Sequence, residues 1–184
     1  MRVFVSVDLD GLEPAVAAVQ EPFEGIGGLR LTDPEGAHLT LKFLGETDPE
    51  RVPEVREALA AAVEAAGVEP FTAAFGGLGV FPSLEYISVV WVGVTRGGEA
   101  LTRLQAAIEE RMVALGFSPE DHEFTPHVTV ARMDHAGGKD RVQELVRTRD
   151  PAVGTLDVEE VRLTESTLAA DGPVYETVAA VSLG

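Results

Sequence analysis

The hydrophobic positions along the chain follow two different periods, and the shorter one predicts a protein rich in β-strands. Several segments combine Val, Leu, Phe and Thr and are mostly bounded by Gly, Pro or Asp, which is typical of strands. They predict strands at residues 2–8, 38–44, 71–81, 88–94, 124–132, 154–165 and 174–182.

Helical spacing governs the segments between these strands. Apolar side chains recur at intervals of three and four over residues 52–66, between Pro49 and Gly67. A second stripe of the same kind covers residues 101–115. Shorter helices are predicted at 12–20 and 139–148, and loops at 33–37, 82–86 and 134–138.

The two halves of the chain repeat the same order of elements. Strand, helix, strand, helix, strand describes residues 2–81, and the same order describes residues 88–165. We interpret this order as an internal duplication with a pseudo-twofold axis, within one two-lobed domain spanning residues 1–184. The predicted fold is α+β and bilobal, with two antiparallel sheets facing a central cleft and helices on the outside.

One tetrapeptide marks the same strand in each half. His38-Leu39-Thr40-Leu41 recurs as His127-Val128-Thr129-Val130. Because successive side chains of a strand point to opposite faces, each histidine shares a face with its threonine, and the aliphatic residues share the other face. Two such strands facing one cleft bring together two imidazoles and two hydroxyls.

This set of groups suits acid–base chemistry on a phosphate. The ordinary histidine pKa, about 6.5, allows one ring to be neutral and the other protonated near neutral pH. The neutral ring can take a proton from water while the imidazolium gives one to a leaving oxygen. The hydroxyls of Thr40 and Thr129 can donate hydrogen bonds to phosphate oxygens, so this chemistry requires no metal.

Composition limits the other possibilities. The chain has no cysteine, which excludes disulfides, thiolate metal sites and cysteine nucleophiles. The first strand lacks the apolar core and cleavage site of a signal peptide, and no apolar run reaches membrane-spanning length. We therefore expect a cytoplasmic protein that does not bind membranes.

The net charge of −17 is better explained as an adaptation to the solvent than as a property that selects the ligand. Abundant Asp and Glu with scarce Lys are typical of proteins from a very salty cytoplasm, and an acidic mesophilic protein is the alternative. At molar salt the Debye length is about 3 Å, so the negative surface repels nucleic acid only weakly. The same charge favours a monomer.

The two motifs and their flanks resemble the two-histidine phosphoesterase superfamily. More closely, they resemble its RNA 2′,3′-cyclic phosphodiesterases, also called 2′-5′ RNA ligases. The similarity runs nearly from end to end of the chain. It is carried by residues 2–9, 38–46, 77–82, 91–94, 124–132 and 161–175. The segment 83–88 departs from the family pattern, which has a Pro-Arg pair there, and this removes a basic contact at the rim of the site.

The resemblance implies hydrolysis of a terminal 2′,3′-cyclic phosphate to a 2′-phosphomonoester, with reverse 2′-5′ ligation as a related activity and no cofactor. By position, His38 falls on the proton donor and His127 on the proton acceptor. Thr40 and Thr129 fall on the residues that hold the phosphate. The implied partners are RNA with a cyclic phosphate end, such as tRNA fragments, or small cyclic nucleotides.

Three further residues are candidate substrate contacts. Arg132 matches an arginine of the family that can bind phosphate or ribose, but strict alternation puts it opposite His127, so a strand end or a bulge is needed. Lys42 alternates onto the face of His38 and can add positive charge, or it protects a strand edge. Phe4 can stack on a base or pack in the core, and Phe124 has the same two interpretations.

Two other classes of function fit the same residues. A metalloenzyme can use the two histidines and a carboxylate as ligands, although no H-x-x-x-H spacing is present and the threonines then have no purpose. A non-catalytic module can bind RNA ends or nucleotides through the same face. Full activity after chelation excludes the metalloenzyme. Loss of turnover on replacing His38 and His127 supports the acid–base enzyme over the non-catalytic module.

Overall fold

The computed structural model describes residues 1–184 and contains nine strands and four α-helices. The strands are β1 Arg2–Asp8, β2 Leu29–Leu31, β3 His38–Glu46, β4 Phe71–Pro82, β5 Ile87–Arg96, β6 His127–Met133, β7 Ala152–Val158, β8 Glu160–Ala169 and β9 Gly172–Ser182. The helices are α1 Glu13–Gln20, α2 Val52–Ala66, α3 Gly98–Ala114 and α4 Lys139–Thr148. Short 3₁₀ turns lie at Glu21–Phe23, Pro34–Gly36, Pro49–Arg51 and Ala136–Gly138.

The predicted elements are present, with three differences. The strand expected over 154–165 is two strands, β7 and β8, separated at Glu159. The strand expected from residue 124 begins at His127, directly after Pro126, which has no backbone N–H to pair. The short strand β2 was not predicted; it is only three residues long and pairs with β6.

The strands form one curled antiparallel sheet, so the predicted α+β class is confirmed, with the two expected sheets joined into one through β3 and β6. Its order is β7-β4-β5-β6-β3-β1-β8-β9. The two halves of this sheet meet between β3 and β6, where Leu39 pairs with Val128. These residues hold the same position in the two H-x-T-x motifs. The pseudo-twofold axis therefore passes through this pair, and the two motifs lie side by side.

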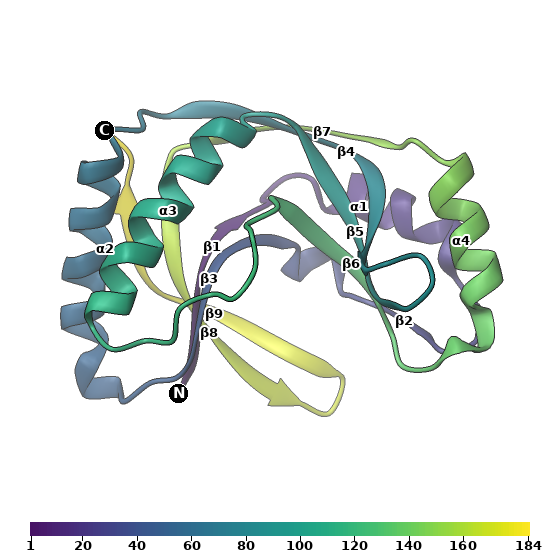
Figure 1. Ribbon diagram of the computed structural model, residues 1–184, viewed down its shortest axis with the longest axis horizontal. Coiled ribbons are helices and arrows are strands. Elements are labelled where there is room, and N and C mark those ends of the chain that lie inside the picture. Colours follow the sequence, from purple (N-terminus) through teal and green to yellow (C-terminus); the bar gives the residue numbers. More distant parts are fainter.

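The two lobes of the molecule do not coincide with the two halves of the sequence. In the first lobe α2 and α3 pack on β1, β3, β8 and β9, and in the second α1 and α4 cover β2 and β4–β7 (Figure 1). Helix α1 and strand β4 thus come from the first half of the chain but lie in the second lobe. Conversely, α3, β8 and β9 come from the second half and lie in the first lobe.

The core lies between the sheet and the helices. Leu39, Leu41, Val128 and Val130 are all buried there. The opposite face of β3 and β6, which carries both histidines and both threonines, is only half-buried, and we call it the inner face. None of the four helices combines the length and the apolar character needed to cross a bilayer.

Candidate active site

A β-bulge in β3 decides which side chains accompany His38. On β1, Ser6 pairs with Thr40 and Val5 pairs with Lys42, so Leu41 is the extra residue. Leu41 and Lys42 are consequently both buried on the helix side. The alternation resumes one residue late and brings Phe43 to the inner face.

The bulge corrects the expected role of Lys42, because it turns this side chain away from the inner face. Lys42 is 1% exposed, and its Nζ lies 2.9 Å from Oε2 of Glu109 and 3.6 Å from Oε1 of Glu120. It also donates to the carbonyl of Ser118 at 2.6 Å. The prediction that Lys42 adds charge beside His38 is wrong; the lysine holds the loop after α3 against β3.

Strand β6 has a bulge at the corresponding position. Its neighbour β5 pairs Trp91 with Thr129 and Val90 with Ala131, so Val130 is the extra residue. Val130 and Ala131 are both buried, and Arg132 is exposed on the face of His127. The bulge that Arg132 requires is therefore present. Its charge lowers the pKa of both His38 and His127, although burial is the larger cause in each case.

The backbone orients the two imidazoles in the same way. His38 Nδ1 lies 2.7 Å from the carbonyl oxygen of Gly36, and His127 Nδ1 lies 2.6 Å from that of Thr125. Each acceptor is two residues before its histidine, and a carbonyl can only accept, so Nδ1 carries the proton in both rings. The two Nε2 atoms are then the nitrogens that are free to exchange protons with a substrate.

Aromatic side chains surround both rings. Phe4 stacks on His38 with the ring centroids 4.7 Å apart, and Tyr175 meets His38 edge-on at 5.0 Å. Phe81 meets His127 edge-on at 4.9 Å, and Trp91 lies at 6.0 Å. This burial is the main reason that the pKa of each histidine is lowered.

Of the two interpretations of Phe4, the structure favours packing over stacking on a base. Its side chain is only 4% exposed, because His38, Phe43 and Tyr175 cover it. Phe4 therefore supports the His38 ring and offers no free face to a base. The other candidate, Phe124, is partly buried against the core.

The charges near the two histidines differ. Asp8, the cross-strand partner of His38, acts to raise the pKa of His38 against the effect of burial. The charges that act on His127 belong to Arg132, His122 and His38, and all of them lower its pKa. Asp8 is itself held by Ser6 Oγ at 2.9 Å and by Arg162 Nη1 at 2.7 Å. Among the neighbouring charges, only Asp8 favours a protonated ring, and it acts on His38, whereas burial and Arg132 disfavour protonation of both rings.

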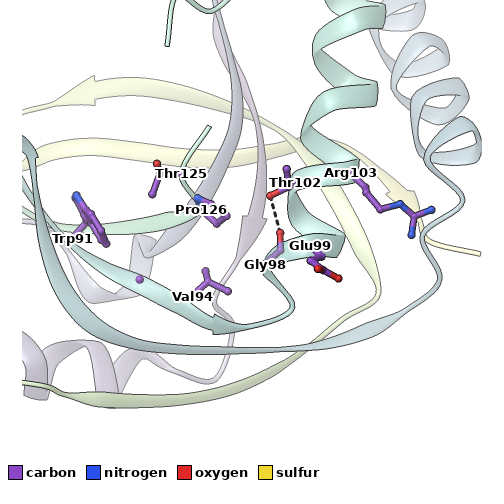
Figure 2. Close-up of a pocket in the computed structure, with 9 residues that line it drawn as sticks. Trp91, Val94, Gly98, Glu99, Thr102, Arg103, Thr125 and Pro126 are labelled. Atoms are coloured by element: carbon purple, nitrogen blue, oxygen red, sulfur yellow. Dashed lines mark hydrogen bonds between the residues drawn. The ribbon is translucent and has the colours of Figure 1, made fainter. Parts of the chain in front are cut away.

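A cavity of about 640 Å³ lies beside His127, between β5 and the start of α3. Figure 2 shows Trp91 and Val94 on one side, Thr102 and Glu99 on the other, and Thr125 and Pro126 between Trp91 and Thr102. Arg103 also lines the cavity, and its guanidinium donates to the carbonyl of Ala66. The buried Trp91 Nε1 has no acceptor in the protein, so an unused donor lies on this side of the site.

The residues do not bring the histidine pair together with a carboxylate as a metal site requires. A three-ligand group of His, Asp or Glu occurs at one place in the chain, Glu120, Asp121 and His122, in the exposed loop before β6. Neither His38 nor His127 belongs to it. The metalloenzyme hypothesis therefore lacks a ligand set at the paired motif.

The paired motif on a curled, duplicated sheet defines the class of two-histidine phosphoesterases. The chain belongs to the 2′-5′ RNA ligase superfamily, whose family model matches residues 12–168. It is 34% identical to the RNA 2′,3′-cyclic phosphodiesterase of Methanothermobacter thermautotrophicus over 95% of both chains. It is 35% identical to the protein of the same name from Archaeoglobus fulgidus, over 96% of this chain and 97% of the relative.

Solved structures have the same fold. The structure of TT0787 from Thermus thermophilus matches with a TM-score of 0.80 and 29% identity, over 100% of this chain and 98% of that one. The structure of E. coli LigT complexed with 3′-AMP matches with a TM-score of 0.78, over 99% and 97% of the two chains. Its sequence identity is 23%, so that likeness concerns the fold.

Proposed function

We propose that the protein is an RNA 2′,3′-cyclic phosphodiesterase that opens the cyclic phosphate to a 2′-phosphomonoester. The observation that carries the proposal is the symmetric pair of imidazoles, each fixed through Nδ1 by a backbone carbonyl and each with Nε2 free. The names of the relatives, at 34% and 35% identity over nearly the whole chain, support the same activity.

The proposed reaction is an in-line displacement at phosphorus. His127 Nε2 takes a proton from a water molecule as its oxygen attacks, and the bond from phosphorus to the ribose O3′ breaks. His38 gives its Nε2 proton to O3′, which leaves a 3′-hydroxyl and a 2′-phosphate. Thr40, Thr129 and Arg132 hold the non-bridging oxygens, whose negative charge increases in the transition state.

The assignment of acid and base rests on the charges around the two rings. His38 lies beside a carboxylate, Asp8, which favours its protonated form, whereas the charges that act on His127 disfavour protonation. A proton donor must start protonated and a proton acceptor must start neutral. The place of Asp8 beside His38 therefore supports His38 as the acid, as the resemblance implies, and leaves His127 as the base.

The deciding experiment uses an oligonucleotide that ends in a 2′,3′-cyclic phosphate, with the protein first treated with a chelator. We expect full turnover and a product with a 2′-phosphate. A 3′-phosphate product, or activity that returns only with an added divalent metal, contradicts the proposal. RNA binding that persists without any turnover supports the non-catalytic module instead.

The same assay compares substrates and solvent. An oligonucleotide and 2′,3′-cyclic AMP as competing substrates separate an RNA end from a small cyclic nucleotide as the preferred substrate. The net charge of −17 further supports the proposal that the protein functions at high salt. We expect the protein to retain activity in molar KCl, because self-repulsion of the acidic surface is screened there. Loss of activity in molar KCl contradicts this part of the proposal.

A further inference from the structure

The duplication places different chemistry at one equivalent position of its two halves. Phe43 follows His38 by five residues, and Arg132 follows His127 by five residues. Each comes directly after a bulge, and each is exposed on the inner face. One half of the site therefore presents a cation at this position, and the other presents an aromatic ring.

Phe43 is the exposed end of a row of rings that leads to His38. It is 61% exposed and pairs across the strands with Phe4, whose ring centroid lies 6.1 Å away. The Phe4 ring in turn stacks on His38. Tyr175 touches both Phe4 and His38 and is 37% exposed. Aromatic surface thus continues outward from the His38 ring.

The packing of Tyr175 fixes this surface to the motif. A Cβ atom on Gly36 would lie only 3.0 Å from the Tyr175 ring, so the ring packs closely on the backbone there. Gly36 also provides the carbonyl that holds His38 Nδ1. The aromatic surface and the His38 imidazole are therefore positioned by the same short turn, Pro34–Gly36.

We propose that Phe43, at the exposed end of the row of rings that includes Phe4 and Tyr175, stacks on the base of the nucleotide that carries the cyclic phosphate. The inference rests on the proposed function and adds the direction in which the nucleotide lies. Such a nucleotide has an anion at one end and an aromatic base at the other. Its phosphate lies toward Arg132 and its base toward Phe43, so the two equivalent positions bind opposite ends of one substrate.

Stacking of this kind accepts every base, because all four bases have a π-face. The surface at Phe43 provides aromatic rings, those of Phe43 and Phe4. We therefore expect a contribution to affinity without strong discrimination between bases. The alternative is that the exposed Phe43 ring packs on a protein partner, and the experiment below distinguishes this from base stacking.

The experiment compares Phe43→Ala with Phe43→Trp on two substrates, 2′,3′-cyclic AMP and a methyl riboside 2,3-cyclic phosphate, which has no base. For Phe43→Ala we expect KM for cyclic AMP to rise roughly 5- to 100-fold with little change in kcat, as the loss of one base–aromatic contact predicts. KM for the riboside stays unchanged. Phe43→Trp keeps the wild-type KM for cyclic AMP.

Val113→Ala is the control, because Val113 is also an exposed large apolar side chain, at 37%, but lies in α3 on the helix side of the sheet. We expect it to change neither KM. The inference is overturned if Phe43→Ala raises KM equally for both substrates or raises it for neither. It is also overturned if Phe43→Ala changes the oligomeric state of the protein. If the wild-type protein hydrolyses neither substrate, the proposed function itself fails, which is a distinguishable result.

Discussion

The two halves of the candidate site share their backbone and differ in their neighbours. In both, a histidine bonds to the carbonyl two residues before it, a threonine follows on the same face, and a bulge comes next. Both rings lie among aromatic side chains and are acted on by Arg132, but a carboxylate, Asp8, raises the pKa of His38 only, and the cavity lies beside His127. The duplication thus provides two equivalent positions for an imidazole, and the side chains around each position make the two rings chemically different, as the proposed acid–base mechanism requires.

The strongest test of this comparison replaces the rings themselves. We expect His38→Ala and His127→Ala each to lower kcat by up to roughly 10⁴-fold without unfolding the protein, since each removes one proton-transfer group. The double variant should be little worse than either single one, because both groups act in one displacement. A single variant with a wild-type rate removes that histidine from the mechanism.

The threonines test whether the symmetry extends to phosphate binding. Thr40→Val and Thr129→Val keep the shape of the side chain and remove the hydroxyl donor. We expect each to lower kcat roughly 10²- to 10³-fold, as the loss of one preorganised donor does. Similar losses in the two variants support equivalent roles, and a loss confined to one shows that the phosphate contacts only that half.

Lys42 contrasts with Arg132, since Arg132 lies on the inner face and Lys42 is buried on the helix side. We expect Lys42→Met to reduce the free energy of unfolding by about 3 kcal/mol, because Glu109 then keeps a poorly solvated charge without its partner. Denaturant unfolding measures this effect, and KM for the cyclic phosphate should stay unchanged. A large rise in KM with normal stability instead places Lys42 in substrate binding.

The smallest expected effect concerns the charge that distinguishes the two rings. Asp8→Asn removes the carboxylate that raises the pKa of His38, so His38 loses its proton at lower pH. If His38 is the acid, the alkaline limb of the pH–kcat profile moves to lower pH while the acid limb stays in place. Asp10→Asn is the control, because Asp10 also pairs with Arg162 but does not act on His38. Movement of the acid limb instead reverses the assigned roles.

The sequence was sufficient to predict the class of fold, most of the elements and the face shared by His38 and Thr40. It was not sufficient for Lys42 and Phe43, because alternation holds only while the strand is regular. The bulge at Leu41 cannot be predicted from the residue types, because Leu41 is apolar and Lys42 has a long aliphatic stem, so both can be buried in succession. The same irregularity at Val130 brings Arg132 to the site, which the family resemblance indicated and periodicity alone did not.

The contacts of Asp8 and Tyr175 also could not be predicted from local sequence patterns. Asp8 meets Arg162, and Tyr175 meets His38, across more than 130 residues of chain. Such pairs depend on which strands become neighbours, and β8 pairs with β1 although the repeat assigns the two strands to different halves. Local periodicity specifies elements, whereas these contacts arise only from the order of strands in the sheet.

The exchange of elements between the two halves determines how the molecule unfolds. Each lobe contains strands and a helix from both halves of the chain, so we expect loss of structure in one lobe to destabilise the other. The catalytic pair is therefore expected to disappear in a single cooperative transition, without a half-folded form that retains one histidine strand. A cut in the segment between β4 and β5 would leave two fragments, each without partner strands that its sheet requires.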